Sequence, residues 1–127
     1  MKKKNFIIVL TFVISIHSYV FADWSKVGAN VERDSFYLDY DRIRKDSGQI
    51  YFWYLVDYPK VNKFGDRSDL TYAKVKCGEL KYKWLQVTYY DSHMGTGKIN
   101  AHGDKNDWSY PPPESIIEKV LNSVCNY

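Results

Sequence analysis

The sequence has few of the residues from which catalytic and metal centres are usually built. It holds three histidines and two cysteines among 127 residues. It also lacks the glycine-flanked serine that hydrolases place on a strained turn. We therefore expect a protein that is not an enzyme and carries no cofactor.

Two weaker chemical patterns lie in the polar stretch 91–107, and neither is specific. His93 and His102, with three aspartates nearby, could ligate a metal, but their spacing matches no recognised site. GTGK at 95–98 resembles a phosphate-binding loop, but the full glycine spacing and a following helix are missing. We expect neither a metal site nor a phosphate site.

Long apolar runs are missing as well. The longest, FIIVLTFVISI at 6–16, has eleven residues, whereas a membrane-spanning helix needs about 20. Three lysines precede this run and Ala22 follows it, which is the order of parts in a secretory signal peptide. The alternative is an uncleaved membrane anchor, which the short and diluted run disfavours. We predict a signal peptide at 1–22, a mature domain at 23–127 and no transmembrane segment after signal removal.

A large excess of charge is also missing once the signal peptide is set aside. The whole chain carries 18 basic and 15 acidic residues. Lys2, Lys3 and Lys4 lie in the signal and no acidic residue precedes Asp23, so the mature domain has 15 residues of each sign. This neutral balance gives no reason to expect a nucleic-acid partner.

Both cysteines, Cys77 and Cys125, lie in the predicted mature domain. In an exported domain a lone pair most simply forms one disulfide, and two free thiols are the alternative. The bridge would close a span of 48 residues, which in the chain-entropy model stabilises a fold by ~4 kcal/mol.

Most of the mature domain has the alternating pattern of β-strands. SFYLDY at 35–40 and QIYFWYLVDY at 49–58 are the clearest, and the second is apolar on both faces, as expected of a central strand. Two further runs within 69–90 flank Gly78 and Glu79, which predicts a hairpin with a type II′ turn. For the polar residues 91–107 we expect a long loop that contains at most a short strand at 97–101.

The register of this hairpin places four lysines together. Lys74 should lie opposite Lys83, and Lys76 opposite Lys81, on the sheet face that does not hold Cys77. Four adjacent ammonium groups repel one another unless carboxylates lie nearby. Either the long side chains spread into water or meet carboxylates of a neighbouring strand, or the four lysines bind an acidic partner.

The chain ends in one short amphipathic helix. Ser115 and Glu118 have the spacing of a capping box, and the apolar residues after Ser115 fall on one helix face. A helix of about ten residues is unstable alone in water, so it should pack on the sheet face that carries Cys77, with Cys125 holding it there. The predicted fold class is α+β: a small antiparallel β-sheet with a C-terminal α-helix packed on one face and tethered by a disulfide.

Tyrosine, by contrast, is abundant. Twelve tyrosines occur in the chain and eleven remain after removal of the signal, beside four tryptophans. A domain of this size cannot bury all of them, and tyrosine and tryptophan are favoured at protein-binding surfaces. The alternative is ordinary aromatic packing within strands.

Taken in order, these features resemble the surface-adhesin protein E family of Gram-negative bacteria. The matching residues, spread over the mature chain, are Trp24, Val27, Tyr37-Leu38-Asp39, Ile43, Gly48, Trp53-Tyr54-Leu55-Val56-Asp57-Tyr58, Ser68, Cys77, Met94-Gly95-Thr96-Gly97, Trp108, Pro111-Pro112-Pro113, Ser115 and Val124-Cys125. The resemblance implies an antiparallel sheet with its C-terminal helix bonded across it by Cys77 and Cys125. It also implies an exported protein that binds host extracellular proteins and can form a homodimer.

One position differs from the family pattern. Surface-displayed members are lipid-anchored, which needs a cysteine directly after the signal, and Asp23 stands there. We expect an exported protein of the periplasm or outer cell surface, or one that is secreted.

The leading hypothesis is an adhesin-like protein that recognises extracellular or host matrix proteins through the polar loop or the sheet face with Lys74, Lys76, Lys81 and Lys83. The alternative is a periplasmic accessory protein that binds an envelope partner.

Overall fold

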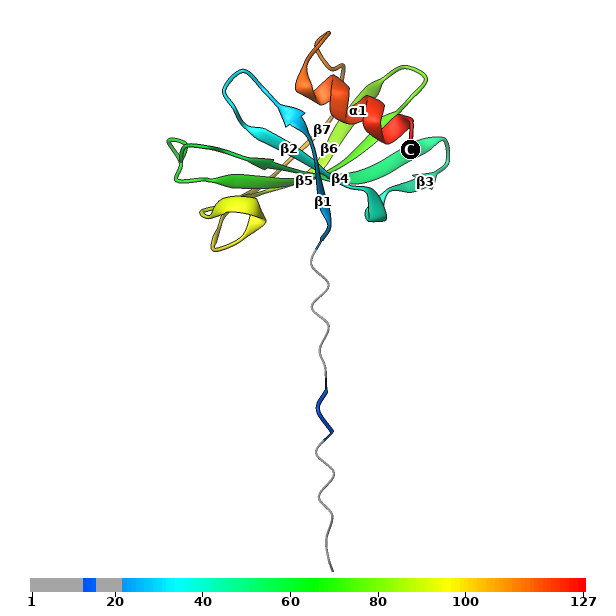
Figure 1. Cartoon of the computed structure of the whole chain (residues 1–127). Helices are drawn as coiled ribbons and strands as arrows, with labels where there is room; N and C mark the ends of the chain where they lie inside the picture. The colour runs from blue at the N-terminus through cyan, green and yellow to red at the C-terminus, as the bar shows by residue number, and fades with distance from the viewer. Residues whose placement is uncertain (1–12, 16–21) are drawn as a thin grey trace, which may run out of the picture.

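The computed structural model describes residues 13–15 and 22–127, and it contains one β-sheet with a helix lying across it (Figure 1). The predicted signal peptide lies almost wholly outside the described residues and stays a prediction. Within the part that is described, no helix is both long enough and apolar enough to pass through a membrane.

The sheet has seven strands, all paired antiparallel. In chain order the elements are β1 (Trp24–Ala29), β2 (Ser35–Asp39), the 3₁₀-helix η1 (Tyr40–Arg42), β3 (Arg44–Asp46), β4 (Gln49–Asp57), β5 (Ser68–Lys76), β6 (Lys81–Tyr90), the 3₁₀-helix η2 (His93–Gly95), β7 (Ile99–Ser109) and α1 (Ile116–Cys125). The strand order is β1-β2-β4-β5-β6-β7, and β3 pairs with the first residues of β4. The predicted α+β fold is confirmed.

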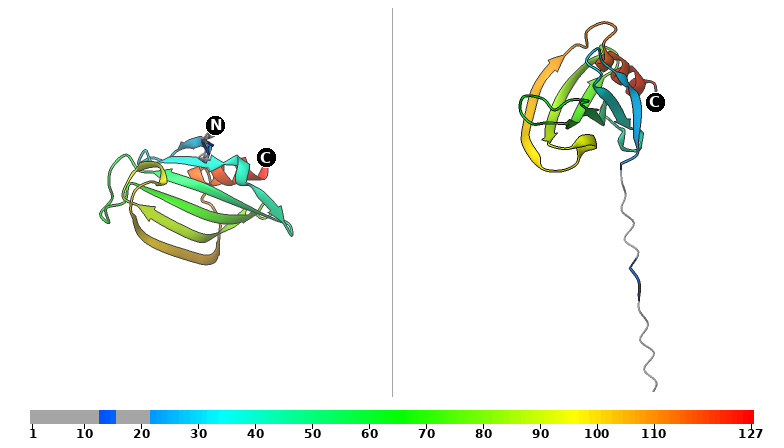
Figure 2. Two further views of the ribbon diagram at one scale, coloured as in Figure 1. Left: turned by 90° about the horizontal axis from the view of Figure 1, so that it is seen from below. Right: turned by 60° about the vertical axis from the view of Figure 1, so that its left-hand side comes forward.

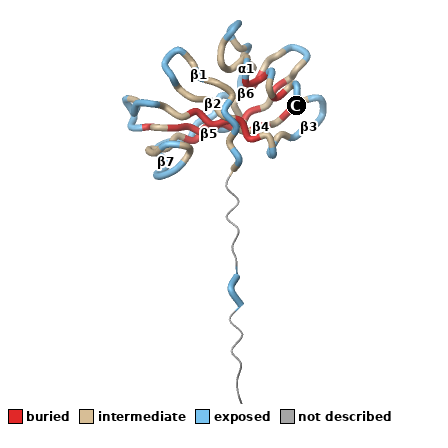
Figure 3. Tube along the Cα trace, in the orientation of Figure 1, coloured by how far each residue is buried: buried red, intermediate tan, exposed pale blue. Residues whose placement is uncertain are grey.

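The central position of β4 follows from its apolar residues on both faces. The sheet is curved (Figure 2), and buried residues concentrate along its middle strands and beneath the helix (Figure 3). Phe52 is fully buried on the face that α1 covers, which we call the helix face. Leu55 is buried on the opposite face, the outer face, where the Cβ position of Gly95 would lie 3.1 Å from it.

The C-terminal helix packs on the sheet as predicted. Val120, Leu121 and Val124 are fully buried in the core. The hydroxyl of Ser115 accepts a hydrogen bond from the backbone N–H of Glu118 at 3.2 Å, so this half of the predicted capping box is present. The Glu118 carboxylate accepts a hydrogen bond from the N–H of Glu114 at 3.3 Å and not from Ser115. The disulfide between Cys77 and Cys125, with Cα atoms 5.8 Å apart, joins the last turn of α1 to the β5–β6 hairpin.

The hairpin register is confirmed, but its turn type was predicted wrongly. Lys74 pairs with Lys83, and Lys76 with Lys81. The ladder ends at this second pair, so four residues, 77–80, make the connection instead of two. In this longer connection the left-handed backbone conformation falls on Leu80, with φ +46°, and not on Gly78.

The prediction of a long loop at 91–107 was also wrong. Only η2 and the residues around it are irregular, and β7 begins at Ile99 and continues to Ser109. This strand forms one edge of the sheet and is exposed from Ile99 to Asp107. An edge strand with little burial does not need the apolar alternation by which strands are recognised in a sequence.

Candidate binding surface

The four predicted lysines lie together around one tryptophan ring. Their ammonium nitrogens lie 5.5, 5.1, 5.2 and 4.8 Å from the ring centre of Trp108, for Lys74, Lys76, Lys81 and Lys83 respectively. Trp108 belongs to the last part of β7, next to Ser109, which pairs with Tyr82 of β6. The negative face of an indole ring attracts cations, which explains how this ring tolerates so much positive charge.

Acidic groups balance only part of this charge. Lys81 forms an ion pair with Glu79 at 2.6 Å, and no other lysine of the cluster has an ion pair among the described residues. The hydrogen bond between the two side chains raises the pKa of Lys81 and lowers the pKa of Glu79. The cluster therefore keeps a local excess of positive charge, although residues 23–127 hold equal numbers of basic and acidic residues.

Three aromatic side chains continue this surface along the outer face. Trp53 stacks on Tyr72 with ring centres 4.7 Å apart, and Tyr51 lies 6.1 Å from Tyr72. Arg44 lies over the ring of Tyr51 at 4.5 Å, and its guanidinium donates a hydrogen bond to the Tyr72 hydroxyl at 3.3 Å. Together with the four lysines and Trp108, the three rings of Tyr51, Trp53 and Tyr72 form what we call the lysine–aromatic face.

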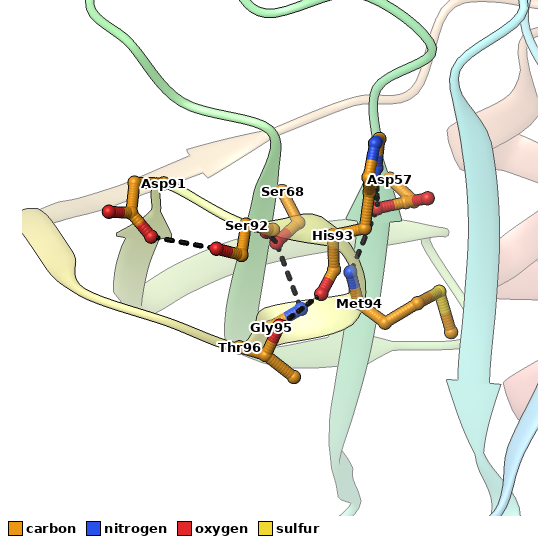
Figure 4. A network of polar contacts seen from close by, with 8 residues as sticks. All are labelled: Asp57, Ser68, Asp91, Ser92, His93, Met94, Gly95 and Thr96. Carbon is orange, nitrogen blue, oxygen red and sulfur yellow. Dashed lines mark hydrogen bonds and ion pairs between the residues drawn. The ribbon is translucent and has the colours of Figure 1, made fainter.

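The residues between β6 and β7, 91–98, cover the other end of the outer face, and we keep the name polar loop for them. Figure 4 shows its hydrogen bonds. The carboxylate of Asp57 accepts hydrogen bonds from the backbone N–H of Met94 at 2.9 Å, and it lies 3.1 Å from Nδ1 of His93. The Ser68 hydroxyl donates to the carbonyl of Ser92 at 2.6 Å and accepts from the N–H of Gly95 at 2.9 Å. These groups bond one another and hold the loop to β4 and β5.

Gly97 closes the same loop in a conformation that a larger residue would disturb. Its φ is +82°, and a Cβ atom there would lie 2.3 Å from a carboxylate oxygen of Asp91. That carboxylate also accepts hydrogen bonds from the Ser92 hydroxyl and the N–H of Lys98, each at 2.9 Å. The polar residues thus build a fixed loop.

The structure does not bring the two histidines together as a metal site. His93 lies against Asp57 of β4, while Nδ1 of His102 lies 3.2 Å from the Thr88 hydroxyl of β6. No group of three or more potential metal ligands occurs among the described residues.

Sequence reasoning located the four lysines but missed the tryptophan between them. The lysines follow from the hairpin register alone, whereas Trp108 reaches them only because β7 pairs with β6. Recognising 99–109 as a strand would have placed the Trp108 ring beside the four lysines. The sequence of this strand is mostly polar, however, and does not show the alternation that indicates a strand.

Solved structures of Haemophilus influenzae protein E are similar to this chain in fold. Crystal form II of that protein matches with a TM-score of 0.64 and 20% identity, over 85% of this chain and 91% of that chain. The protein E crystal structure from non-typeable Haemophilus influenzae matches with a TM-score of 0.57 and 18% identity, over 86% of this chain and 79% of that chain. Comparison with curated protein sequences gives no match. The family described as Surface-adhesin protein E matches residues 24–126, and the chain therefore belongs to the surface-adhesin protein E family.

Proposed function

We propose that this protein is an exported, non-enzymatic adhesin that recognises an acidic segment of an extracellular or host matrix protein through the lysine–aromatic face. The observation that carries the proposal is the cluster of four ammonium groups around Trp108, of which only Lys81 has an ion pair among the described residues. An acidic partner would relieve their mutual repulsion. The neighbouring rings of Trp53 and Tyr72 would supply apolar contact of the kind that dominates protein interfaces.

The polar loop is the weaker candidate for the same function. Its side chains already bond to one another and to the strands beneath, so contact with a partner would compete with existing hydrogen bonds. The lysine–aromatic face has the unbalanced charge, and we assign the binding to it.

A charge-neutralising variant tests this proposal. The mature domain and a variant with Lys74, Lys76, Lys81 and Lys83 changed to Gln are compared for binding to immobilised heparin, as a polyanion probe, and to acidic matrix proteins. Exposed charge pairs contribute about 0.2–1 kcal/mol each, so we expect binding at low salt to weaken by about tenfold or more. The difference should shrink as salt screens the charges.

The matched control changes four exposed lysines outside this face, Lys26, Lys60, Lys63 and Lys98, to Gln. It removes the same net charge and should bind like the unmodified domain. Equal binding of the two variants at low salt would rule out the lysine–aromatic face.

A further inference from the structure

The helix covers only part of the helix face. A helix of ten residues is about 15 Å long, whereas a strand of nine residues such as β4 extends about 30 Å. Beyond α1 the same face holds a hollow of about 210 Å³, and no residue of α1 lines it. The hollow is bounded by the aromatic rings of Phe36, Tyr58, Trp84 and Tyr89 and by the carboxyl groups of Asp34 and Asp69. We call it the acidic–aromatic pocket.

Asp69 is a buried carboxyl group without a positive partner. Its side chain is 8% exposed. One oxygen accepts a hydrogen bond from the Tyr58 hydroxyl, and the other accepts one from the Thr71 hydroxyl at 3.2 Å. Among the described residues, no ion pair involves Asp69 or Asp34. A buried carboxylate without a counter-charge is costly, and a guest cation would supply that charge.

Burial and the groups that face Asp69 set the pKa of its carboxyl group. Burial raises the pKa of Asp69 to about 6, the hydrogen bonds from Tyr58 and Thr71 oppose this rise, and the charges of Asp34 and Asp66 add to it. Burial also raises the pKa of Tyr54, Tyr58 and Tyr89, so these hydroxyls stay neutral at physiological pH. At neutral pH the pocket therefore offers negative charge and aromatic surface.

Cationic side chains lie near this pocket without lining it. Arg33 and Lys60 line an adjoining hollow that shares Asp34 and Tyr58 with the pocket. The exposed Lys105 places its ammonium 5.8 Å from the ring centre of Trp84. It is not among the residues that bound the hollow, so a guest need not displace it.

We propose that the acidic–aromatic pocket binds an organic cation, the ammonium or guanidinium group of a lysine or arginine side chain of a partner protein. Aromatic walls with a carboxyl group are the combination that proteins use to hold such cations. The hollow is smaller than the roughly 300–1,000 Å³ of pockets for drug-sized ligands, and it suits a single side chain.

The rim of the pocket favours a side chain that belongs to a protein over a free small cation. Two adjoining hollows share residues with the pocket. One shares Asp34 and Tyr58 and is lined by Val31 beside the charged residues Glu32, Arg33 and Lys60. The other shares Tyr89 and is lined by Phe64. Val31 is 99% exposed and Phe64 is 71% exposed. These apolar side chains would contact the residues that flank the bound cation. This site lies on the opposite sheet face from the lysines and does not depend on the function proposed for them.

Titration of the mature domain with defined cations tests the proposal. The probes are acetyl-lysine amide, acetyl-arginine amide and tetramethylammonium, with neutral acetyl-norleucine amide as the control for apolar contact. We expect the cations to shift the indole NMR signal of Trp84 and the amide signal of Thr71 to saturation, and the norleucine probe to leave both unchanged. The tripeptide acetyl-Leu-Lys-Leu-amide should bind at least threefold more tightly than acetyl-lysine amide. Tetramethylammonium binding as tightly as the tripeptide would overturn the assignment to a partner's side chain.

Two variants remove the charge and an aromatic wall separately. Asp69→Asn and Tyr89→Leu should each weaken cation binding at least tenfold. Binding to the unmodified domain should weaken as the pH falls below about 6, because Asp69 then takes up a proton. Asp41→Asn removes an exposed carboxylate of η1, beyond the end of β2 that is far from the pocket, and should bind normally. Undiminished cation binding by both pocket variants, or no saturable shift with any cation, would overturn the proposal. The lysine variants of the outer face should bind these cations normally, which separates this test from that of the proposed function.

Discussion

At the scale of single residues, aromatic rings adjoin opposite charges on the two faces of the sheet. Trp108 on the outer face is surrounded by ammonium groups, whereas Tyr58 and Trp84 on the helix face border carboxyl groups. The high aromatic content of the sequence predicts that some rings lie at surfaces. The strand register and the bulges in β6 decide which ring lies beside which charge. Amino-acid composition does not predict either of them.

The buried carboxyl group of Asp69 should make stability depend on pH in an unusual direction. Its pKa is about 6 in the folded state against an ordinary value of 3.8, so between these values the folded state holds its proton more firmly than the unfolded state. The contribution of Asp69 to the free energy of unfolding is then largest below pH 4 and falls by about 3 kcal/mol as the pH rises through 6.

Urea denaturation of the unmodified domain and of Asp69→Asn at pH 4 and pH 7 measures this effect. Other carboxylates act in both proteins, so the difference between the two is the relevant quantity. We expect Asp69→Asn to gain stability relative to the unmodified domain on going from pH 4 to pH 7. If the difference in the free energy of unfolding between the two proteins did not change with pH, Asp69 would not be a buried carboxyl group without a counter-charge. Asp41→Asn, at an exposed position, serves as the control.

At the scale of elements, predictability follows burial. The strands β4, β5 and β6 and the helix α1 are each buried on at least one face, and their periodic apolar residues predicted them correctly. The edge strand β7 is exposed over most of its length, and its polar sequence was predicted as a loop. Trp108 lies in this missed strand. The sequence therefore failed to predict the tryptophan of the site because the strand that carries it lacks alternating apolar residues.

The disulfide should be essential for holding α1 on the sheet. The helix buries three apolar residues completely, yet it has only ten residues and is unstable alone. In the chain-entropy model, a bridge closing 48 residues stabilises the fold by ~4 kcal/mol. That is a large part of the roughly 5–15 kcal/mol by which a domain is stable. Changing Cys77 and Cys125 together to Ala should therefore lower the urea midpoint strongly.

The cap variant Ser115→Ala provides the control for this measurement. It removes the hydrogen bond to the N–H of Glu118 and should cost about 1 kcal/mol while leaving the bridge intact. If the double cysteine variant were no less stable than Ser115→Ala, the bridge would have no special role in holding the helix.

At the scale of the whole molecule, the two proposed surfaces lie on opposite faces of one sheet. The lysine cluster lies behind the part of the sheet that α1 covers, and the acidic–aromatic pocket lies on the helix face beyond it. The two surfaces can therefore be occupied at the same time. The alternating apolar residues of the strands and the amphipathic C-terminal segment predicted the fold class. The pocket depends on how far α1 extends along the strands, and no local sequence pattern predicts that length. The homodimer implied by the family resemblance stays a prediction.

The proposed adhesin function requires a protein that is reachable from outside the cell, and surface labelling can measure this. Lys26, Lys60, Lys63 and Lys98 are exposed, so an amine reagent that reaches the protein should modify them. Intact native cells are treated with a membrane-impermeant amine label, with a known periplasmic protein as the internal control. We expect labelled adhesin and unlabelled control, because a protein displayed on the surface meets the reagent while one enclosed by the outer membrane does not. Labelling that begins only after the outer membrane is permeabilised would place the protein in the periplasm and favour an accessory role with an envelope partner.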